Sequence, residues 1–385
     1  MSEQSAFQGA GTSVKNIIEL VRSAISTVWA WFIRRSPAMA LVRLGVAVFL
    51  ASAAGSYTLS GSYREAGTSV EVSLKTGDTL AVVTFVGLFL SALLIIGGLI
   101  WEMYRQRQEK KRLDRLRVIV IEQLSLKNAP TSPLSKALPG RFEGHVEEIM
   151  YDVRDRVIDN AITDPPAVLS EILSLKSDVV RRTAGRDRAD VSVVYGGRMA
   201  VPFTFVTGVL LGDEGNITVF DWDRKPGGGW KELLEDDDHE RFQISGLAQA
   251  TTEQVVLAIS VSYPIVASDI ATAFSGLPVV TMQIPSQSSD LHWSMKKQGE
   301  WSMQVLQVFK TLAAQGVKRV HLILAAPNSV SFEFGRRHDE ALLPDTVIYA
   351  YTKDRTPAYP WGIRIPRPGI NQAEVIWAKA SASVQ

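Results

Sequence analysis

The chain has 385 residues, a net charge of +1 and no cysteine. A net charge near zero gives no overall field of the kind that draws a protein to nucleic acid, and no DNA or RNA duplex is expected as a partner. The lack of cysteine excludes disulfides, thiolate metal sites and a cysteine nucleophile. The histidines are not spaced like metal ligands; they are His145, His239, His292, His321 and His338.

The N-terminal residues 1–36 are predicted to form a tail and an amphipathic helix. Residues 1–12 are small and polar, which is typical of a disordered terminus. Over 13–32, apolar residues recur at helical spacing, and the charged residues lie elsewhere on the helical wheel. Because a membrane segment follows, this pattern indicates either a helix lying in the membrane interface or a helix that packs on a neighbouring subunit.

Two apolar segments predict a pair of transmembrane helices within residues 37–104. Residues 79–101 hold no charged side chain, and 23 residues at about 1.5 Å each cross a hydrocarbon core of roughly 30 Å. Buried helices of soluble proteins, the alternative, rarely run this long without a polar position. Residues 38–57 form the other span, with Arg43 near its start, where a long side chain can reach the surface. A cleaved signal peptide is the alternative for this span.

Basic residues predict the orientation of the spans. Seven arginines and lysines lie within 105–117, just after the second span, and Arg22, Arg34 and Arg35 precede the first. The intervening loop, residues 58–78, carries only two basic residues. The positive-inside rule therefore places both termini in the cytoplasm. Neither span carries paired acidic groups, so a dedicated transporter is not indicated.

Residues 105–188 are predicted to be a helical linker. The second span is expected to continue as a helix over 102–126, with its basic residues near anionic lipid headgroups. Three prolines interrupt the chain between 128 and 139, and a second helix is predicted over 142–160. Asp164, Pro165 and Pro166 form a helix-start signal for a third helix that extends to about 182.

The remainder, residues 189–385, alternates short β-branched runs with helical stretches, which predicts an α/β fold with largely parallel sheets. The runs are 191–195, 216–222, 255–263, 279–284, 320–325 and 346–351. Residues 191–224 align without a gap to 320–353, and each copy reads strand, small-residue turn, helix, strand. Unless this similarity is chance, two Rossmann-like halves lie side by side. Ligands of such sheets bind at the carboxyl ends of the strands.

The candidate ligand-binding residues follow these strand ends. Two glycines permit close backbone approach, and the next residue, Arg198, can pair with a phosphate. Asn328 and Ser329 begin the helix of the second copy, where they act as helix caps or as donors to a ligand. The aromatic side chains of Trp222 and Tyr351 stack on bases or pack in the core. The full set is Gly196, Gly197, Arg198, Trp222, Ser262, Tyr263, Pro264, Pro327, Asn328, Ser329, Phe332 and Tyr351.

Three segments carry a resemblance to a known family. They read ISVSYPI at 259–265, RVHLILAAPNSVSFEFGRR at 319–337 and VIYAYTK at 347–353. Over 255–367 the chain resembles a SAVED domain, a fused pair of CARF-like Rossmann halves. With the two predicted spans, the whole chain is similar to the two-transmembrane SAVED effectors of CBASS-type anti-phage systems.

This resemblance implies a receptor-effector of the bacterial inner membrane, not an enzyme. It implies that the protein binds a cyclic oligonucleotide made by a cognate CD-NTase cyclase, without cofactor or metal. The bound protein is then expected to form homo-oligomers and disrupt the lipid bilayer, which aborts phage infection. Two alternatives stay open. One is a membrane-tethered enzyme that degrades the cyclic nucleotide, although the sequence holds no nucleophile–base pair, metal cluster or Walker-type loop. The other is a scaffold that binds no nucleotide.

Overall fold

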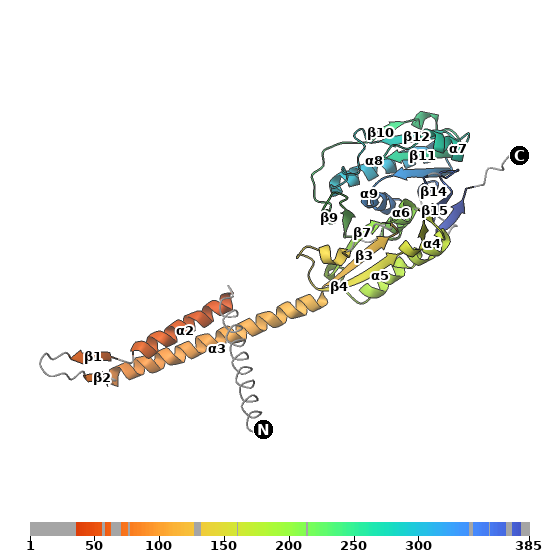
Figure 1. Cartoon of the computed structure of the whole chain (residues 1–385). Coiled ribbons are helices and arrows are strands. Elements are labelled where there is room, and N and C mark those ends of the chain that lie inside the picture. The colour runs from red at the N-terminus through yellow and green to blue at the C-terminus, as the bar shows by residue number, and fades with distance from the viewer. Residues whose placement is uncertain are drawn as a thin grey trace, which may run out of the picture. The chain divides into compact units, whose positions relative to one another are not determined.

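The structure, a computed structural model, describes residues 36–55, 58–62, 71–75, 78–126, 132–159, 161–212, 215–338, 342–353, 355–366 and 372–378. The amphipathic helix predicted over 13–32 lies outside the described residues. The chain divides into two compact units, Met1–Arg112 and Leu113–Gln385 (Figure 1).

The first unit holds two long helices joined by a hairpin. They are α2 (Pro37–Gly55) and α3 (Asp78–Arg115), and between them β1 (Thr58–Ser62) pairs antiparallel with β2 (Glu71–Lys75) (Figure 1). Both helices are long and apolar enough to cross a membrane, over Pro37–Ala54 and Val82–Arg115. The two spans predicted from the sequence are therefore confirmed as helices of the required length. The hairpin between them carried no recognised pattern in the sequence.

Helices α2 and α3 contact each other closely. A Cβ placed on Gly98 would lie 2.8 Å from the backbone oxygen of Ala38, so only a glycine permits this approach. At the same end of the pair, Ser36 Oγ donates a hydrogen bond of 2.8 Å to the buried carboxylate of Glu102. The pair is thus held by backbone contact together with one buried polar link.

The second unit contains two β-sheets. The five-stranded sheet has the order β4-β3-β7-β8-β9, and its first four strands are parallel. The strands are β3 (Arg117–Leu124), β4 (His145–Asp152), β7 (Val191–Arg198), β8 (Ile217–Trp222) and β9 (Trp230–Glu232).

The seven-stranded sheet has the order β10-β12-β11-β13-β14-β15-β16, and the four strands from β12 to β14 are parallel. Its strands are β10 (Gln243–Ser245), β11 (Gln254–Ser260), β12 (Val279–Gln283), β13 (Arg319–Ala325), β14 (Asp345–Ala350), β15 (Trp361–Arg364) and β16 (Glu374–Trp377). The short strands β5 (Val157–Ile158) and β6 (Ala161–Ile162) pair with each other.

Two helices, α6 (Val201–Leu210) and α9 (Asn328–Arg336), lie between the sheets (Figure 1). Helix α6 packs on β14 and β15, whereas α9 packs on β7 and β8. Helix α9 also joins two apolar cores, because Val330 and Phe334 belong to a core on the seven-stranded sheet and Phe332 to one on the five-stranded sheet. The other helices are α4 (Pro165–Leu173), α5 (Leu175–Thr183), α7 (Ala267–Ala273) and α8 (Met295–Ala314).

The repeat predicted over 191–224 and 320–353 is confirmed at the level of elements. Its first copy forms β7, α6 and β8, and its second forms β13, α9 and β14. In both copies the two strands are parallel neighbours. The α/β fold with largely parallel sheets is confirmed as well, and the six predicted strands are all present.

The prediction of a helical linker over 105–188 is wrong in two segments. The helix expected over 102–126 ends at Arg115 and is followed by β3, whose residues Val118–Ile121 are buried on both faces of the sheet. The helix expected over 142–160 is replaced by β4, which alternates buried Ile149 and Tyr151 with exposed residues. The third predicted helix is confirmed, as α4 and α5. The sheet that contains β7 thus begins well before residue 189, while the domain boundaries at 36, 104 and 188 stay predictions.

Candidate ligand-binding cleft

The carboxyl ends of β7, β8, β13 and β14 surround a cleft of about 250 Å³. Both copies of the repeat contribute to it, because the turn after β7 meets the turn after β13. Parallel strands expose backbone groups at this edge, which is where ligands of open α/β sheets bind. The predicted site residues that line the cleft are Gly197, Arg198, Trp222, Asn328 and Tyr351.

Asn328 fastens the two turns together. Its Oδ1 accepts the N–H of Met199 at 2.7 Å, and its Nδ2 donates to the carbonyl oxygen of Met199 at 2.9 Å. Met199 occupies the position in the first copy that corresponds to Asn328 in the second, 129 residues apart. Because both ends of the amide are engaged, Asn328 holds the floor of the cleft together in this structure.

Two arginines give the cleft its charge. The Arg198 guanidinium lies 5.6 Å from the centroid of the Trp222 ring, and Arg224 also lines the cleft. Burial and the nearby charge of Arg224 lower the pKa of Arg198, and the Asp221 carboxylate opposes that effect. Two guanidinium groups that repel one another would both gain from an anion bound between them, and phosphate suits the arginine fork.

Asp221 lies buried at the base of the cleft. Its Oδ2 accepts the Ser329 N–H at 2.9 Å and lies 3.4 Å from His292 Nε2, and its Oδ1 accepts the Trp222 N–H at 2.7 Å. Burial alone would raise the pKa of Asp221, but His292 and the Ser329 N–H outweigh it and hold this pKa below its ordinary value. A carboxylate is therefore fixed beneath the arginines, and it links β8 to the start of α9.

The end of a further strand, β11, reaches the cleft through a hydrogen bond. Arg224 Nη1 donates to Tyr263 Oη at 3.3 Å, and Tyr263 follows β11. Tyr263 and Tyr351 are 55% and 54% exposed as residues, so each can offer a ring face on which a flat ligand stacks. The arrangement combines positive charge with exposed aromatic faces.

The remaining predicted site residues do not line the cleft. Phe332 is fully buried and stacks on Tyr195 with ring centroids 3.9 Å apart, so it packs the core. Gly196 faces the opposite side of β7, where a Cβ would lie 2.8 Å from Leu134. Ser329 is buried, and its Oγ accepts a hydrogen bond of 3.0 Å from Gln298. Ser262 and Pro327 are buried beside strand ends, and Pro264 lines a different cavity.

Asp221 and Arg224 line the cleft but were not among the residues predicted from the sequence. Asp221 was part of a β-branched run and was counted only as strand, although a carboxylate in such a run is a signal in itself. Arg224 aligns with Lys353 in the repeat. Each of these basic residues lies two residues after an aromatic residue, Trp222 or Tyr351, so the shared basic position could be recognised from the sequence. Among the described residues, no group of three or more histidines and carboxylates could hold a metal ion.

Comparison with protein families gives two matches. Residues 175–365 match the SAVED family, described as the SMODS-associated and fused to various effectors sensor domain. Residues 15–169 match the SAVED-fused 2TM effector domain. The two matches follow each other along the chain and leave out only 1–14, 170–174 and 366–385.

Solved structures similar to the chain include SAVED/CARF-domain containing receptors named Cap4. The receptor of Acinetobacter baumannii with the cyclic trinucleotide 2′3′3′-cAAA has a TM-score of 0.42 at 11% identity, over 73% of this chain and 58% of the receptor chain. Its complex with 3′3′3′-cAAA gives 0.41 at 11%, over 73% and 59%. The receptor of Moraxella osloensis gives 0.38 at 12%, over 72% and 57%.

A comparison with curated proteins gives no match. The family matches account for both described units, since the effector match contains α2 and α3 and the sensor match contains the whole repeat. The chain is a membrane protein, and it belongs to the family in which a two-transmembrane effector domain is fused to a SAVED sensor domain.

Proposed function

We propose that the protein is a membrane-anchored receptor-effector that binds a cyclic oligonucleotide in the cleft. The observation that carries this proposal is the pair Arg198 and Arg224 beside exposed aromatic rings, where the two halves of a sensor domain meet. A cyclic oligonucleotide presents phosphates and flat bases together. Arginines pair with the phosphates, and rings such as Tyr351 stack on the bases.

The effector step follows from the small size of the anchor. A pair of helices, α2 and α3, cannot enclose a wide pore, so membrane damage requires many copies. A ligand drives assembly only if it binds the assembled state more tightly than the free protein. A shift from about 1% to 99% assembled requires roughly 5.5 kcal/mol of differential binding.

In this proposal a cognate CD-NTase cyclase makes the ligand during phage infection. The protein lies in the bacterial inner membrane with both termini in the cytoplasm, where it meets the ligand. Ligand-bound copies form homo-oligomers, and the crowded anchors disrupt the bilayer. The protein itself is not an enzyme and needs no cofactor.

The test of binding is calorimetry of the full-length protein in nanodiscs against cyclic di-, tri- and tetranucleotides. We expect one ligand to bind, and we expect Arg198→Ala or Arg224→Ala to weaken that binding about tenfold to a hundredfold, as charge-assisted hydrogen bonds are worth roughly 1.5–3 kcal/mol. The control is Arg186→Ala, since Arg186 is exposed and lies outside the cleft. Equal weakening by all three variants, or by none, would refute the cleft as the site.

Assembly is tested with the same protein in liposomes. Energy transfer between labelled copies should rise when the ligand is added, and an enclosed dye should then escape. Tight binding without energy transfer would refute assembly as the signal.

Chromatography of the ligand after incubation tests the alternative that the protein is an enzyme, because an enzyme would convert the ligand. A scaffold would bind no member of the panel.

A further inference from the structure

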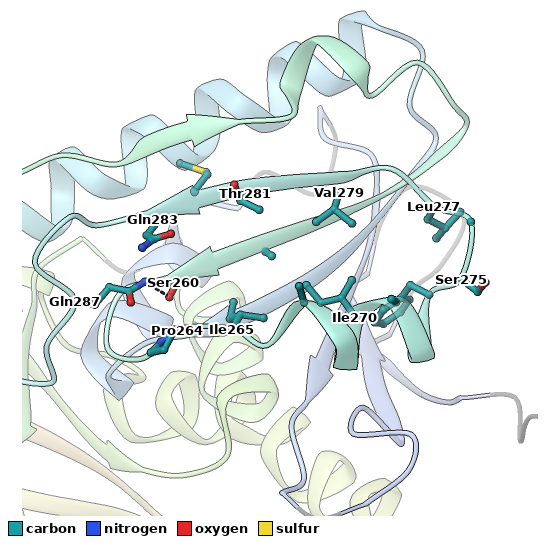
Figure 2. A pocket seen from close by; sticks show the side chains of 16 residues that line it. Ser260, Pro264, Ile265, Ile270, Ser275, Leu277, Val279, Thr281, Gln283 and Gln287 are labelled. Carbon is teal, nitrogen blue, oxygen red and sulfur yellow. Dashed lines mark hydrogen bonds between the residues drawn. The ribbon is translucent and has the colours of Figure 1, made fainter.

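A second cavity, of about 470 Å³, lies on the seven-stranded sheet between β11, β12 and α7 (Figure 2). It exists because short side chains face one another there. Ala258 projects from β11, and Ala267 and Ala271 line the cavity from α7. Helix α7 has only seven residues and covers only part of the sheet. The helix and the sheet therefore leave a space that larger side chains would fill.

The walls of this cavity differ from those of the cleft. Figure 2 shows the apolar side chains of Ile270, Leu277 and Val279 at one end and the polar side chains of Gln283 and Gln287 at the other. No Asp, Glu, Lys, Arg or His is among the described residues that line it. A phosphate or carboxylate would find no cation there, so the cavity suits an uncharged ligand with one polar edge.

The polar end offers both kinds of hydrogen-bonding group. Gln287 Nε2 donates to Ser260 Oγ at 2.6 Å, which fixes the Gln287 side chain (Figure 2). Within the described part of the chain, the Gln283 side-chain amide has no hydrogen-bond partner, so its donor and acceptor are both free. A glutamine amide matches the adjacent donor and acceptor on a purine edge, and apolar walls hold the faces of a base.

A single loop connects the cavity with the cleft. Ser260, at the polar end of the cavity, donates from Oγ to the backbone oxygen of Tyr263, and Pro264 lines the cavity. The Tyr263 hydroxyl accepts the hydrogen bond from Arg224, which lines the cleft. A ligand that contacts Arg224 therefore lies beside the loop that borders the second cavity.

We propose that the cavity beside α7 is a second binding site, which takes an uncharged purine base. The base has two possible sources, a free nucleoside or one base of the cyclic oligonucleotide in the cleft. If the base belongs to the cyclic oligonucleotide, the inference rests on the proposed function. If the base belongs to a free nucleoside, it does not. The shared chemistry is a flat heterocycle held by apolar walls and read by Gln283.

The experiment uses the full-length protein in nanodiscs and two probes, adenosine and 3′3′3′-cyclic triadenylate, measured by equilibrium dialysis. Gln283→Leu replaces the amide with an apolar side chain that is one atom shorter, and Ala258→Leu fills the cavity. The matched control is Gln307→Leu, since Gln307 is exposed on α8 and does not line the cavity. We expect at least one probe to bind. We expect both cavity variants, but not the control, to weaken the binding of that probe about tenfold or more.

The two sources give different results. Weakened adenosine binding identifies a free nucleoside as an occupant, whereas weakened binding of cyclic triadenylate alone identifies a base of the ring. If the wild-type protein binds neither probe, or if neither probe responds to the two variants, the proposal is wrong. Circular dichroism checks folding, and if Ala258→Leu fails to fold, the exposed Gln283 position decides the outcome.

Arg224→Ala separates this inference from the proposed function. If it weakens binding of cyclic triadenylate while the cavity variants change neither probe, the cleft stands and the base site is wrong. If cyclic triadenylate does not bind but adenosine binding responds to the cavity variants, the base site stands without support for the proposed function.

Discussion

Polar side chains at the floor of the cleft connect the two halves of the sensor domain residue by residue. Asn328 from the second copy holds both backbone groups of Met199 in the first. Asp221 from the first copy accepts the N–H of Ser329 in the second. Each of these two hydrogen-bonded links joins one copy of the repeat to the other. A ligand in the cleft is therefore met by groups whose positions depend on both halves.

His321 is the residue for which the structure predicts a pH effect. It lies on β13 and is 9% exposed, with Nδ1 2.9 Å from Tyr349 Oη and Nε2 3.0 Å from Gln254 Oε1. A neutral ring satisfies both contacts when Tyr349 donates and Nε2–H donates. Burial, aided by the charge of Arg319 and opposed by Asp345, lowers the pKa of His321 to about 4.

The stability of the protein should therefore fall as the pH falls from about 6.5 to 4. In this pH window His321 binds a proton in the unfolded chain but not in the folded chain. The free energy of unfolding therefore falls by about 1.4 kcal/mol for each pH unit, and this fall levels off near the folded-state pKa. His321→Gln should remove this part of the slope in urea unfolding followed by tryptophan fluorescence. His239→Gln is the control, because the His239 side chain is 77% exposed. Parallel pH profiles for wild type and His321→Gln would contradict the prediction.

At the scale of elements, the crossing of α6 and α9 depends on two glycines. A Cβ on Gly208 would lie 2.1 Å from the Phe332 oxygen, and one on Gly335 would lie 2.1 Å from the Phe205 oxygen. Both obstacles are backbone atoms that cannot rotate away. The helices therefore touch through their backbones, and this close approach sets the spacing between the two sheets.

We expect Gly208→Ala and Gly335→Ala each to destabilise the protein by about 1–3 kcal/mol or more, because each overpacks the crossing. The matched control is Gly299→Ala in α8, where a Cβ meets nothing within 4 Å. This change should stabilise the protein by up to about 1 kcal/mol, since alanine favours the helix. Urea unfolding measures all three. A stable Gly335→Ala protein would show that the helices can separate without cost.

The elements that the sequence predicted well share a simple pattern. The strands from 191 onward are β-branched runs set between helical stretches, and the spans are long and apolar. Strand β3 was missed because Leu113, Leu116, Val120 and Leu124 also fit a helical spacing that continued from α3. Only the strand pairing in the structure shows that residues 117–124 form a strand between β4 and β7. A fragment that begins near 142 would lack this interior strand.

The site was partly predictable for a similar reason. Strand ends can be read from the sequence, and the predicted residues Gly197, Arg198 and Tyr351 line the cleft. The side of an element that a residue faces is a tertiary property, which is why Phe332 was taken for a ligand contact and lies in the core. A carboxylate in a β-branched run marked Asp221, but its partner His292 lies 71 residues later and contacts it only in the fold.

For the whole molecule, the prediction concerns its topology in the membrane. Basic residues flank the two spans on the side of the termini, so the loop between them should lie outside the cytoplasm. Cysteines introduced by Ser69→Cys and Ser383→Cys, which lie outside the described residues, test this, because the natural chain has no cysteine. An impermeant thiol reagent should label the first variant in intact cells and not the second. Permeabilised cells, in which both should react, provide the control, and the reverse pattern would refute the topology.

The junction between the membrane helix and the sheet is a single residue. Helix α3 ends at Arg115 and β3 begins at Arg117, with only Leu116 between them. Each residue of an α-helix adds about 100° of rotation and 1.5 Å of length. One residue inserted within α3 would turn the helical side chains after it by about 100° relative to those before it, whereas seven residues, close to two turns, would nearly restore their facing. The number of residues in α3 therefore fixes the register of the side chains along it.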